Sequence, residues 1–149
     1  MSETIVVGTD GSDTAKQAVA EAVRLAKAFD ADLHAVTAYK AVRGAKIAEP
    51  PQGGVKVLAV LPDDFARSVV EEVATALRFA GVKGETHMLE RDPADALLEV
   101  AARVGADLIV VGSQGMTGAK RLLGSVPNKV AHEASCNVLI VSTHKTAVS

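Results

Sequence analysis

The chain has 149 residues, of which 48% are apolar, and its formal net charge is −2. This length fits one domain with one core, and interspersed charges with one Tyr, three Phe and no Trp argue against a nucleic-acid surface, which needs clustered cations or stacking aromatics. Cys136 is the single cysteine, and neither a signal peptide nor a membrane-spanning run is visible, so we expect a reduced, cytoplasmic protein. We expect its one domain to cover residues 1–149.

The first quarter of the chain predicts a strand, a helix and a second strand. The β-branched run at 5–7 ends at Gly8 and indicates a buried strand. Small and apolar residues recur at helical spacing through 15–29, with Ser12 or Asp13 as the predicted N-cap. Residues 33–39 then return as a strand.

The next segment, about 40–54, contains Pro and Gly and has no sustained period, which is typical of a surface loop or a lid. Residues 55–61 fit either a short strand or more loop. A second amphipathic helix is predicted to open at 62–64 and to end at Gly81.

The remaining elements continue the alternation of strand and helix. Residues 85–89 and 107–111 are predicted strands, and between them Asp92-Pro93 has the composition of a helix start, with Gly105 at its end. A short helix is predicted at about 127–134, and the last strand at 138–141.

The predicted strands are continuous apolar runs and not alternating ones. Such strands, separated by helices, are typical of a parallel sheet covered on both faces. We therefore expect a doubly wound α/β domain, in which ligands bind beyond the carboxyl ends of the strands where the strand order reverses.

Two glycine-containing loops follow predicted strands and are candidates for that site. The first is Gly8-Thr9-Asp10-Gly11-Ser12, and the second begins at Gly112-Ser113-Gln114-Gly115. Farther on, Gly124-Ser125-Val126-Pro127 predicts a helix N-terminus with Ser125 as N-cap and Pro127 in the first turn. Its free amides suit phosphate oxygens, and Lys120, Arg121 and Lys129 would add positive charge.

These loops match neither the P-loop pattern nor the GxGxxG dinucleotide fingerprint. From spacing alone, a phosphate cradle and a flexible connection with glycines at its helix boundaries are equally supported.

Four stretches together resemble the universal stress protein family, and they cover nearly the whole chain. They are VVGTDGS at 6–12, DPADALLEVA at 92–101, ADLIVVGSQG at 106–115 and LLGSVPNKVAHEASCNVLIV at 122–141. The resemblance implies a Rossmann-like, five-stranded parallel sheet in the order 3-2-1-4-5. It also implies binding of ATP, or of a related adenine nucleotide such as cyclic AMP, through a G-x2-G-x9-G-[ST] motif.

The resemblance also implies roles for individual residues. Gly112 and Gly115 would lie against the ribose and α-phosphate, and Gly124, Ser125 and the Val126 backbone would bind the outer phosphates. Asp10, with Thr9 beside it, would lie near the nucleotide or its Mg²⁺ ion. Val36 and Val111 would border the adenine.

Two departures from the family pattern stand out. Eight residues, not nine, separate Gly115 from Gly124. Arg91 stands where family members often carry Gly before Asp-Pro, and it either caps a loop or reaches the ligand.

Three functions are compatible with these features. The first is a regulatory or sequestering module that binds an adenine nucleotide and is not an enzyme. The others are a slow ATPase and a protein-interaction module without a functional nucleotide site. The near-intact motif favours the first. The family commonly dimerises through its last strand, which implies a homodimer formed by residues 138–141. The interspersed charges and the lack of a long apolar run lead us to expect neither a nucleic-acid nor a membrane partner.

Other reactive side chains give weaker signals. His132-Glu133 lacks the second histidine of HExxH, and His34, His87 and His144 show no ligand spacing with one another. We expect Cys136 to be inert and buried next to the last strand.

Overall fold

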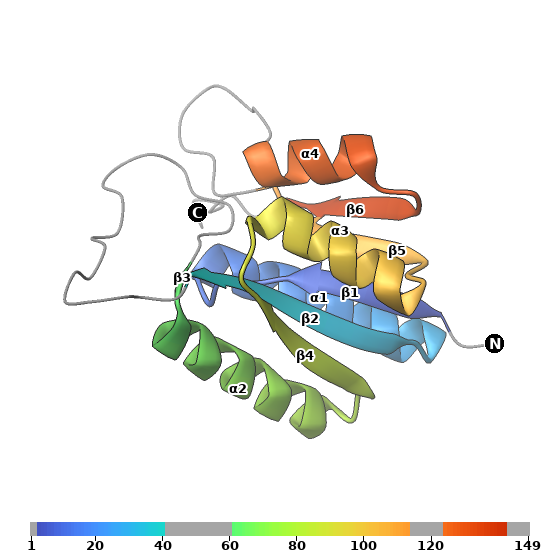
Figure 1. Cartoon of the computed structure of the whole chain (residues 1–149). Coiled ribbons are helices and arrows are strands. Elements are labelled where there is room, and N and C mark those ends of the chain that lie inside the picture. Colours follow the sequence, from blue (N-terminus) through green and yellow to red (C-terminus); the bar gives the residue numbers. More distant parts are fainter. Residues whose placement is uncertain (1–2, 41–60, 114–123, 143–149) are drawn as a thin grey trace, which may run out of the picture.

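The computed structural model describes residues 3–40, 61–113 and 124–142, and Figure 1 shows a central sheet with helices on both faces. No helix of these residues is both long enough and apolar enough to cross a membrane. Along the chain the elements are β1 (Thr4–Gly8), α1 (Asp13–Phe29), β2 (Asp32–Lys40), β3 (Leu61–Pro62), α2 (Asp63–Ala80), β4 (Gly84–Leu89), α3 (Pro93–Val104), β5 (Leu108–Gly112), α4 (Ser125–Glu133) and β6 (Asn137–Val141).

The predicted helix boundaries arise from local capping. Ser12 is the N-cap of α1, and its side chain accepts a hydrogen bond from the N–H of Ala15. Asp92 caps α3 in the same way, with Pro93 in the first turn. Gly81 ends α2 in the left-handed conformation that a residue without Cβ adopts at little cost.

All strand pairs are parallel, and the five longer strands lie in the order β4-β2-β1-β5-β6. This is the predicted 3-2-1-4-5 order, so the doubly wound α/β prediction is confirmed. The additional strand β3 is only two residues long and pairs with Tyr39 and Lys40 at the end of β2. Of the segment predicted as either strand or loop, Leu61 is in β3 and residues 55–60 lie outside the described residues. The loop or lid predicted at about 40–54 also lies almost entirely outside them.

Alternate residues of the strands supply two cores, one on each face of the sheet. Val6, Val36 and Ile109 face the core that α3 and α4 cover. Ile5, Leu33 and their neighbours pack against α1 and α2 on the opposite face. Figure 1 shows α3 in front of the sheet and α1 behind it.

The amino ends of β1 and β5 are joined by a reciprocal pair of hydrogen bonds. The Thr4 N–H donates to Oδ2 of Asp107 at 2.9 Å, and the Asp107 N–H donates to the Thr4 carbonyl at 2.8 Å. These bonds fix the register in which Val7 lies opposite Val110. The two strands therefore end at the same edge of the sheet, where the predicted site lies.

Candidate functional site

The reversal of strand order lies between β1 and β5, which are neighbours although β2 and β6 continue the sheet in opposite directions. Gly8 ends β1 and Gly112 ends β5, and both glycines are buried. The loops that follow them leave from the same edge, as the sequence predicts. In a doubly wound sheet this crevice is where ligands bind.

The loop after β1 is held to β2 by two hydrogen bonds. The Thr9 N–H donates to the Val36 carbonyl at 3.0 Å, and the Thr37 hydroxyl donates to the Thr9 carbonyl at 2.9 Å. Thr9 is 2% exposed and Thr37 is fully buried. Both backbone groups of Thr9 are thus satisfied inside the protein, and the direction of the chain at the mouth of β1 is fixed.

Side chains within the same loop shape its turn toward α1. The Thr9 hydroxyl accepts the N–H of Gly11 at 3.1 Å, and Oδ1 of Asp10 accepts the N–H of Ser12 at 2.9 Å. The Asp10 residue is only 7% exposed. Ser12 is the N-cap of α1, as predicted, and Asp10 orders the turn before it.

Gly11 has a backbone requirement that the turn imposes. Its φ is +80°, and a Cβ at this position would lie 2.8 Å from Cγ2 of Val69 on α2. The loop therefore packs directly on α2, and a side chain at residue 11 would meet both backbone strain and a steric clash.

The N-terminus of α4 differs by one residue from the prediction. Gly124 is the N-cap and Ser125 is the first helical residue, so the prediction that Ser125 caps the helix is wrong, and the helix starts two residues earlier than residue 127. Helix geometry leaves the N–H groups of Ser125 and Val126 without an intrahelical acceptor. Ser125 is exposed, whereas Val126 and Pro127 are buried and anchor this turn to the core.

Two cations near the starts of α3 and α4, Lys129 and Arg91, form ion pairs with residues of α3. Nζ of Lys129 lies 2.9 Å from Oδ1 of Asp95, and the hydrogen bond lowers the pKa of the Asp95 carboxyl. This pair joins the first turn of α3 to α4, so Lys129 has a partner other than a phosphate. Arg91 contacts Glu99, and this ion pair places its guanidinium beside α3.

The remaining predicted site residues fall into two groups. Val36 and Val111 are 2% and 0% exposed, and both side chains belong to the core beneath α3 and α4. Gln114 and Gly115 lie outside the described residues, as do Lys120 and Arg121. The eight residues between Gly115 and Gly124 also lie outside the described part of the chain.

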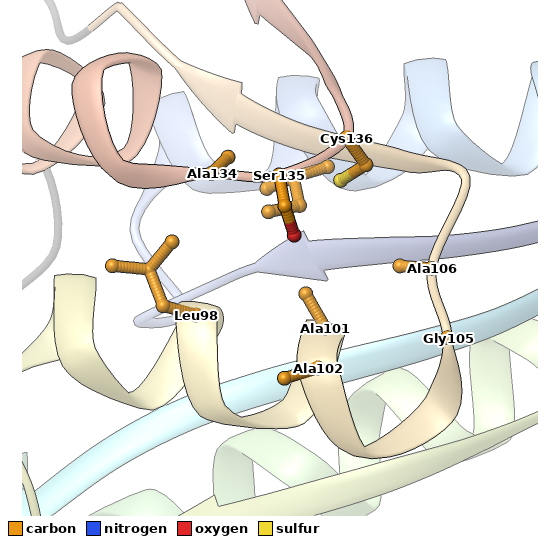
Figure 2. A pocket seen from close by; sticks show the side chains of 9 residues that line it. Leu98, Ala101, Ala102, Gly105, Ala106, Ala134, Ser135 and Cys136 are labelled. Carbon is orange, nitrogen blue, oxygen red and sulfur yellow. The ribbon is translucent and has the colours of Figure 1, made fainter.

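A separate pocket of about 270 Å³ lies near the amino ends of β5 and β6, at the opposite edge of the sheet. Figure 2 shows Leu98, Ala101 and Ala102 of α3 on one side of it and Ser135 and Cys136 on the other. Cys136 is only partly buried, which corrects the prediction of a buried thiol. Burial, and secondarily the Asp107 carboxylate, raises the pKa of this thiol.

Comparison with known proteins agrees with the observed α/β fold. The sequence model of the universal stress protein family matches residues 1–142. The chain belongs to this family.

The family assignment is supported by individual relatives. A universal stress protein of Methanocaldococcus jannaschii is 37% identical, with 95% of this chain and 82% of the relative covered. One from Mycobacterium tuberculosis strain H37Rv is 39% identical, with 95% and 97% covered. A universal stress protein solved in complex with cAMP is 38% identical, covers 95% of this chain and 98% of its own, and has a TM-score of 0.71.

This universal stress protein also contains a side-chain cluster that the sequence did not predict. Nδ1 of His34 on β2 lies 3.0 Å from Nε2 of His87 on β4. The two residues are 53 positions apart, so their spacing along the chain carries no signal. Only the parallel register of β2 with β4 brings them together.

Proposed function

We propose that this universal stress protein binds an adenine nucleotide, ATP or cyclic AMP, and acts as a regulatory or sequestering module. The observation that carries the proposal is the meeting of the Gly8–Ser12 loop and the end of β5 at one sheet edge, where the strand order reverses. The relative solved with cAMP, at 38% identity over 95% of this chain, supports the adenine class.

The proposed contacts use backbone more than side chains. Gly112 and Gly115 allow the backbone to approach the ribose and α-phosphate closely. Gly124 and the amides of Ser125 and Val126 at the start of α4 receive the outer phosphates, which the helix dipole favours. In this proposal Val36 and Val111 border the adenine. The remaining residues of the nucleotide site are Gly8, Thr9, Gln114 and Pro127.

Asp10 is the proposed link to Mg²⁺. Its carboxylate lies at the mouth of β1, and one oxygen already holds the turn through the Ser12 N–H. Mg²⁺ bound to ATP takes one or two protein carboxylates and otherwise phosphates and water, so a single buried carboxylate fits this chemistry. The ion would neutralise phosphate charge, and Asp10 would orient it.

The proposed module holds its nucleotide without rapid turnover and works in the cytoplasm. One alternative is a slow ATPase, which hydrolysis measurements test. The other is a protein-interaction module without a functional nucleotide site, which binding measurements test. An ATPase requires a positioned base beside the phosphates.

The test is to denature the purified protein, identify released small molecules, and titrate the ligand-free protein with ATP and with cyclic AMP. We expect one nucleotide per chain and negligible hydrolysis over the same period. Gly115→Val should abolish nucleotide binding, because the valine side chain would fill the space in which the protein backbone approaches the ligand. The far-UV circular dichroism spectrum should stay unchanged. Unchanged affinity in this variant would refute the site assignment, and multiple turnovers would favour the ATPase.

We also propose a homodimer formed through β6, which lies at the end of the strand order. Residues Val138 to Val141 are half-buried, and an apolar edge strand invites pairing. Val141→Lys should weaken the dimer, since the lysine ammonium group can reach water in the monomer but not when β6 is paired with the β6 strand of a second protomer. Analytical ultracentrifugation at micromolar concentration checks this, and a monomeric wild-type protein would exclude the dimer.

A further inference from the structure

We propose that His34, Glu85 and His87 form a binding site for a transition metal ion, with Zn²⁺ as the best fit. Each residue offers one ligand atom, and these atoms all lie within 4.8 Å of one another. Two imidazoles and one carboxylate are a ligand set that Zn²⁺ uses in sites that keep a fourth position open. This site is independent of the proposed nucleotide function.

The register of two parallel strands creates the cluster. His34 on β2 lies opposite Glu85 on β4, and Val36 lies opposite His87. Since side chains alternate between the faces of a sheet, His34, Glu85 and His87 project from the same face. That face is the one which α3 covers, because Val36 belongs to the core beneath α3.

The distance between the imidazole nitrogens fits coordination to one ion. Nδ1 of His34 and Nε2 of His87 are 3.0 Å apart, and two nitrogens bound tetrahedrally at the usual Zn–N length are separated by about 3.3 Å. The rings are tilted by 37° with centroids 5.2 Å apart. The rings therefore meet through their nitrogen atoms and are not stacked face to face.

Metal binding needs only a change of tautomer in the ring that donates the present hydrogen bond. Its proton moves to the other nitrogen of the same ring, and both facing nitrogens then offer lone pairs. No oxidation or net proton release is required when both rings start neutral.

The surroundings permit an ion to enter and compensate part of its charge. His34 and His87 are half-buried and Glu85 is exposed, so solvent reaches the cluster. Glu85 supplies a negative charge. Arg103 on α3 is a nearby cation, and its Nη2 lies 2.5 Å from Oε2 of Glu99, a carboxylate that Arg91 also contacts.

A bound ion would cross-link β4, the end strand of the sheet on this side, to β2. Ligands that bind only the folded state stabilise it. The site is therefore expected to couple zinc concentration to the stability of the β4 edge.

The experiment uses the full-length protein, stripped of metal with a chelator and free of nucleotide, and titrates it with zinc chloride by calorimetry. We expect one Zn²⁺ per chain and a higher midpoint of thermal unfolding when zinc is present. His34→Gln and His87→Gln should each weaken zinc binding by at least about tenfold and remove the thermal shift, and Glu85→Gln should weaken it less.

Two control variants test other zinc ligands: His132→Gln, on the exposed face of α4, and Cys136→Ser should bind zinc as the wild type does. Equal zinc affinity in the wild type and in both His34→Gln and His87→Gln would overturn the site and leave the simple histidine hydrogen bond. A second measurement does not depend on how the variants fold: cobalt added to the wild-type protein should give the intense visible absorption of a tetrahedral site, and the weak spectrum of a hydrated ion would overturn the proposal.

Discussion

The Thr37 hydroxyl donates to the Thr9 carbonyl across 2.9 Å, and both residues are buried. This one bond joins the middle of β2 to the loop that leaves β1. We expect Thr37→Val to destabilise the protein by about 1–3 kcal/mol, because the variant keeps the shape but leaves a buried carbonyl without its donor.

Chemical denaturation measures this loss of stability. Thr75→Val on α2 is the matched control, since its hydroxyl also donates to a backbone carbonyl but lies in an exposed position. We expect the control to change stability by less than about 0.5 kcal/mol. Equal effects of the two substitutions would show that the Thr37 bond has no special role.

Gly11→Ala tests the close approach between the β1 loop and α2. The new Cβ would be strained by a φ of +80° and would lie 2.8 Å from Cγ2 of Val69. Gly105→Ala separates the two effects, since its φ is +66° and nothing lies within 4 Å of its Cβ position. We expect Gly105→Ala to lower the free energy of unfolding by about 1–2 kcal/mol, and Gly11→Ala to lower it by more.

The stability loss caused by Gly11→Ala should shrink when the substitution is made in a Val69→Ala background, because the clashing methyl group is then absent. A double-mutant cycle of unfolding free energies measures this coupling. A coupling of zero would mean that the loop moves away from α2 at no cost.

Asp10→Asn separates the charge of this side chain from its structural role. The amide oxygen of Asn still accepts the Ser12 N–H that Oδ1 of Asp10 accepts, so stability should change little. If Asp10 orients Mg²⁺, ATP affinity in the presence of Mg²⁺ should fall by about tenfold, while binding of cyclic AMP should be affected less. Asp13→Asn, on the exposed first turn of α1, is the control, and equal losses for both nucleotides would argue against a metal role.

Cys136 should react slowly with alkylating reagents in the folded protein. Burial first, and then the Asp107 carboxylate, raises the pKa of its thiol, so less thiolate is present than in a free cysteine at the same pH. The rate-against-pH curve should shift to higher pH than that of the denatured protein, and Asp107→Asn should shift it partly back. Coinciding curves for folded and denatured protein would contradict this expectation.

The same pKa shift fixes the sign of an effect on stability. The folded thiol keeps its proton at a pH where the unfolded thiol has lost it. The contribution of Cys136 to the free energy of unfolding is therefore complete below the usual thiol pKa of about 8.5, and it declines as the pH rises beyond that value. Cys136→Ser should therefore flatten the alkaline limb of the stability profile.

Local signals account for most of what the sequence predicted correctly. Ser12, Asp92 and Gly81 act within a few residues of their own position, so their roles as caps follow from residue type and the neighbouring helical period. The strand order needed the family resemblance as well, because apolar runs show that strands exist without showing which ones pair.

The features that sequence reasoning missed depend on relations between distant elements. The start of α4 is displaced because Val126 packs into the core, and Gly124 then occupies the capping position. His34 and His87 meet only through the register of β2 with β4. Aligning the amino ends of the two predicted strands, 33–39 and 85–89, would place the two histidines on opposite faces, because the observed register pairs Leu33 with Gly84.

The bonds between Thr4 and Asp107 have a consequence for folding on the ribosome. β1 is synthesised first, and its neighbour β5 follows more than a hundred residues later, since Thr4 and Asp107 are 103 positions apart. At about 5–20 residues per second, one side of the first strand would wait roughly 5 to 20 s for its partner. During that interval its unpaired edge needs protection, and a chaperone that binds short apolar segments would have its best target in residues 5–7.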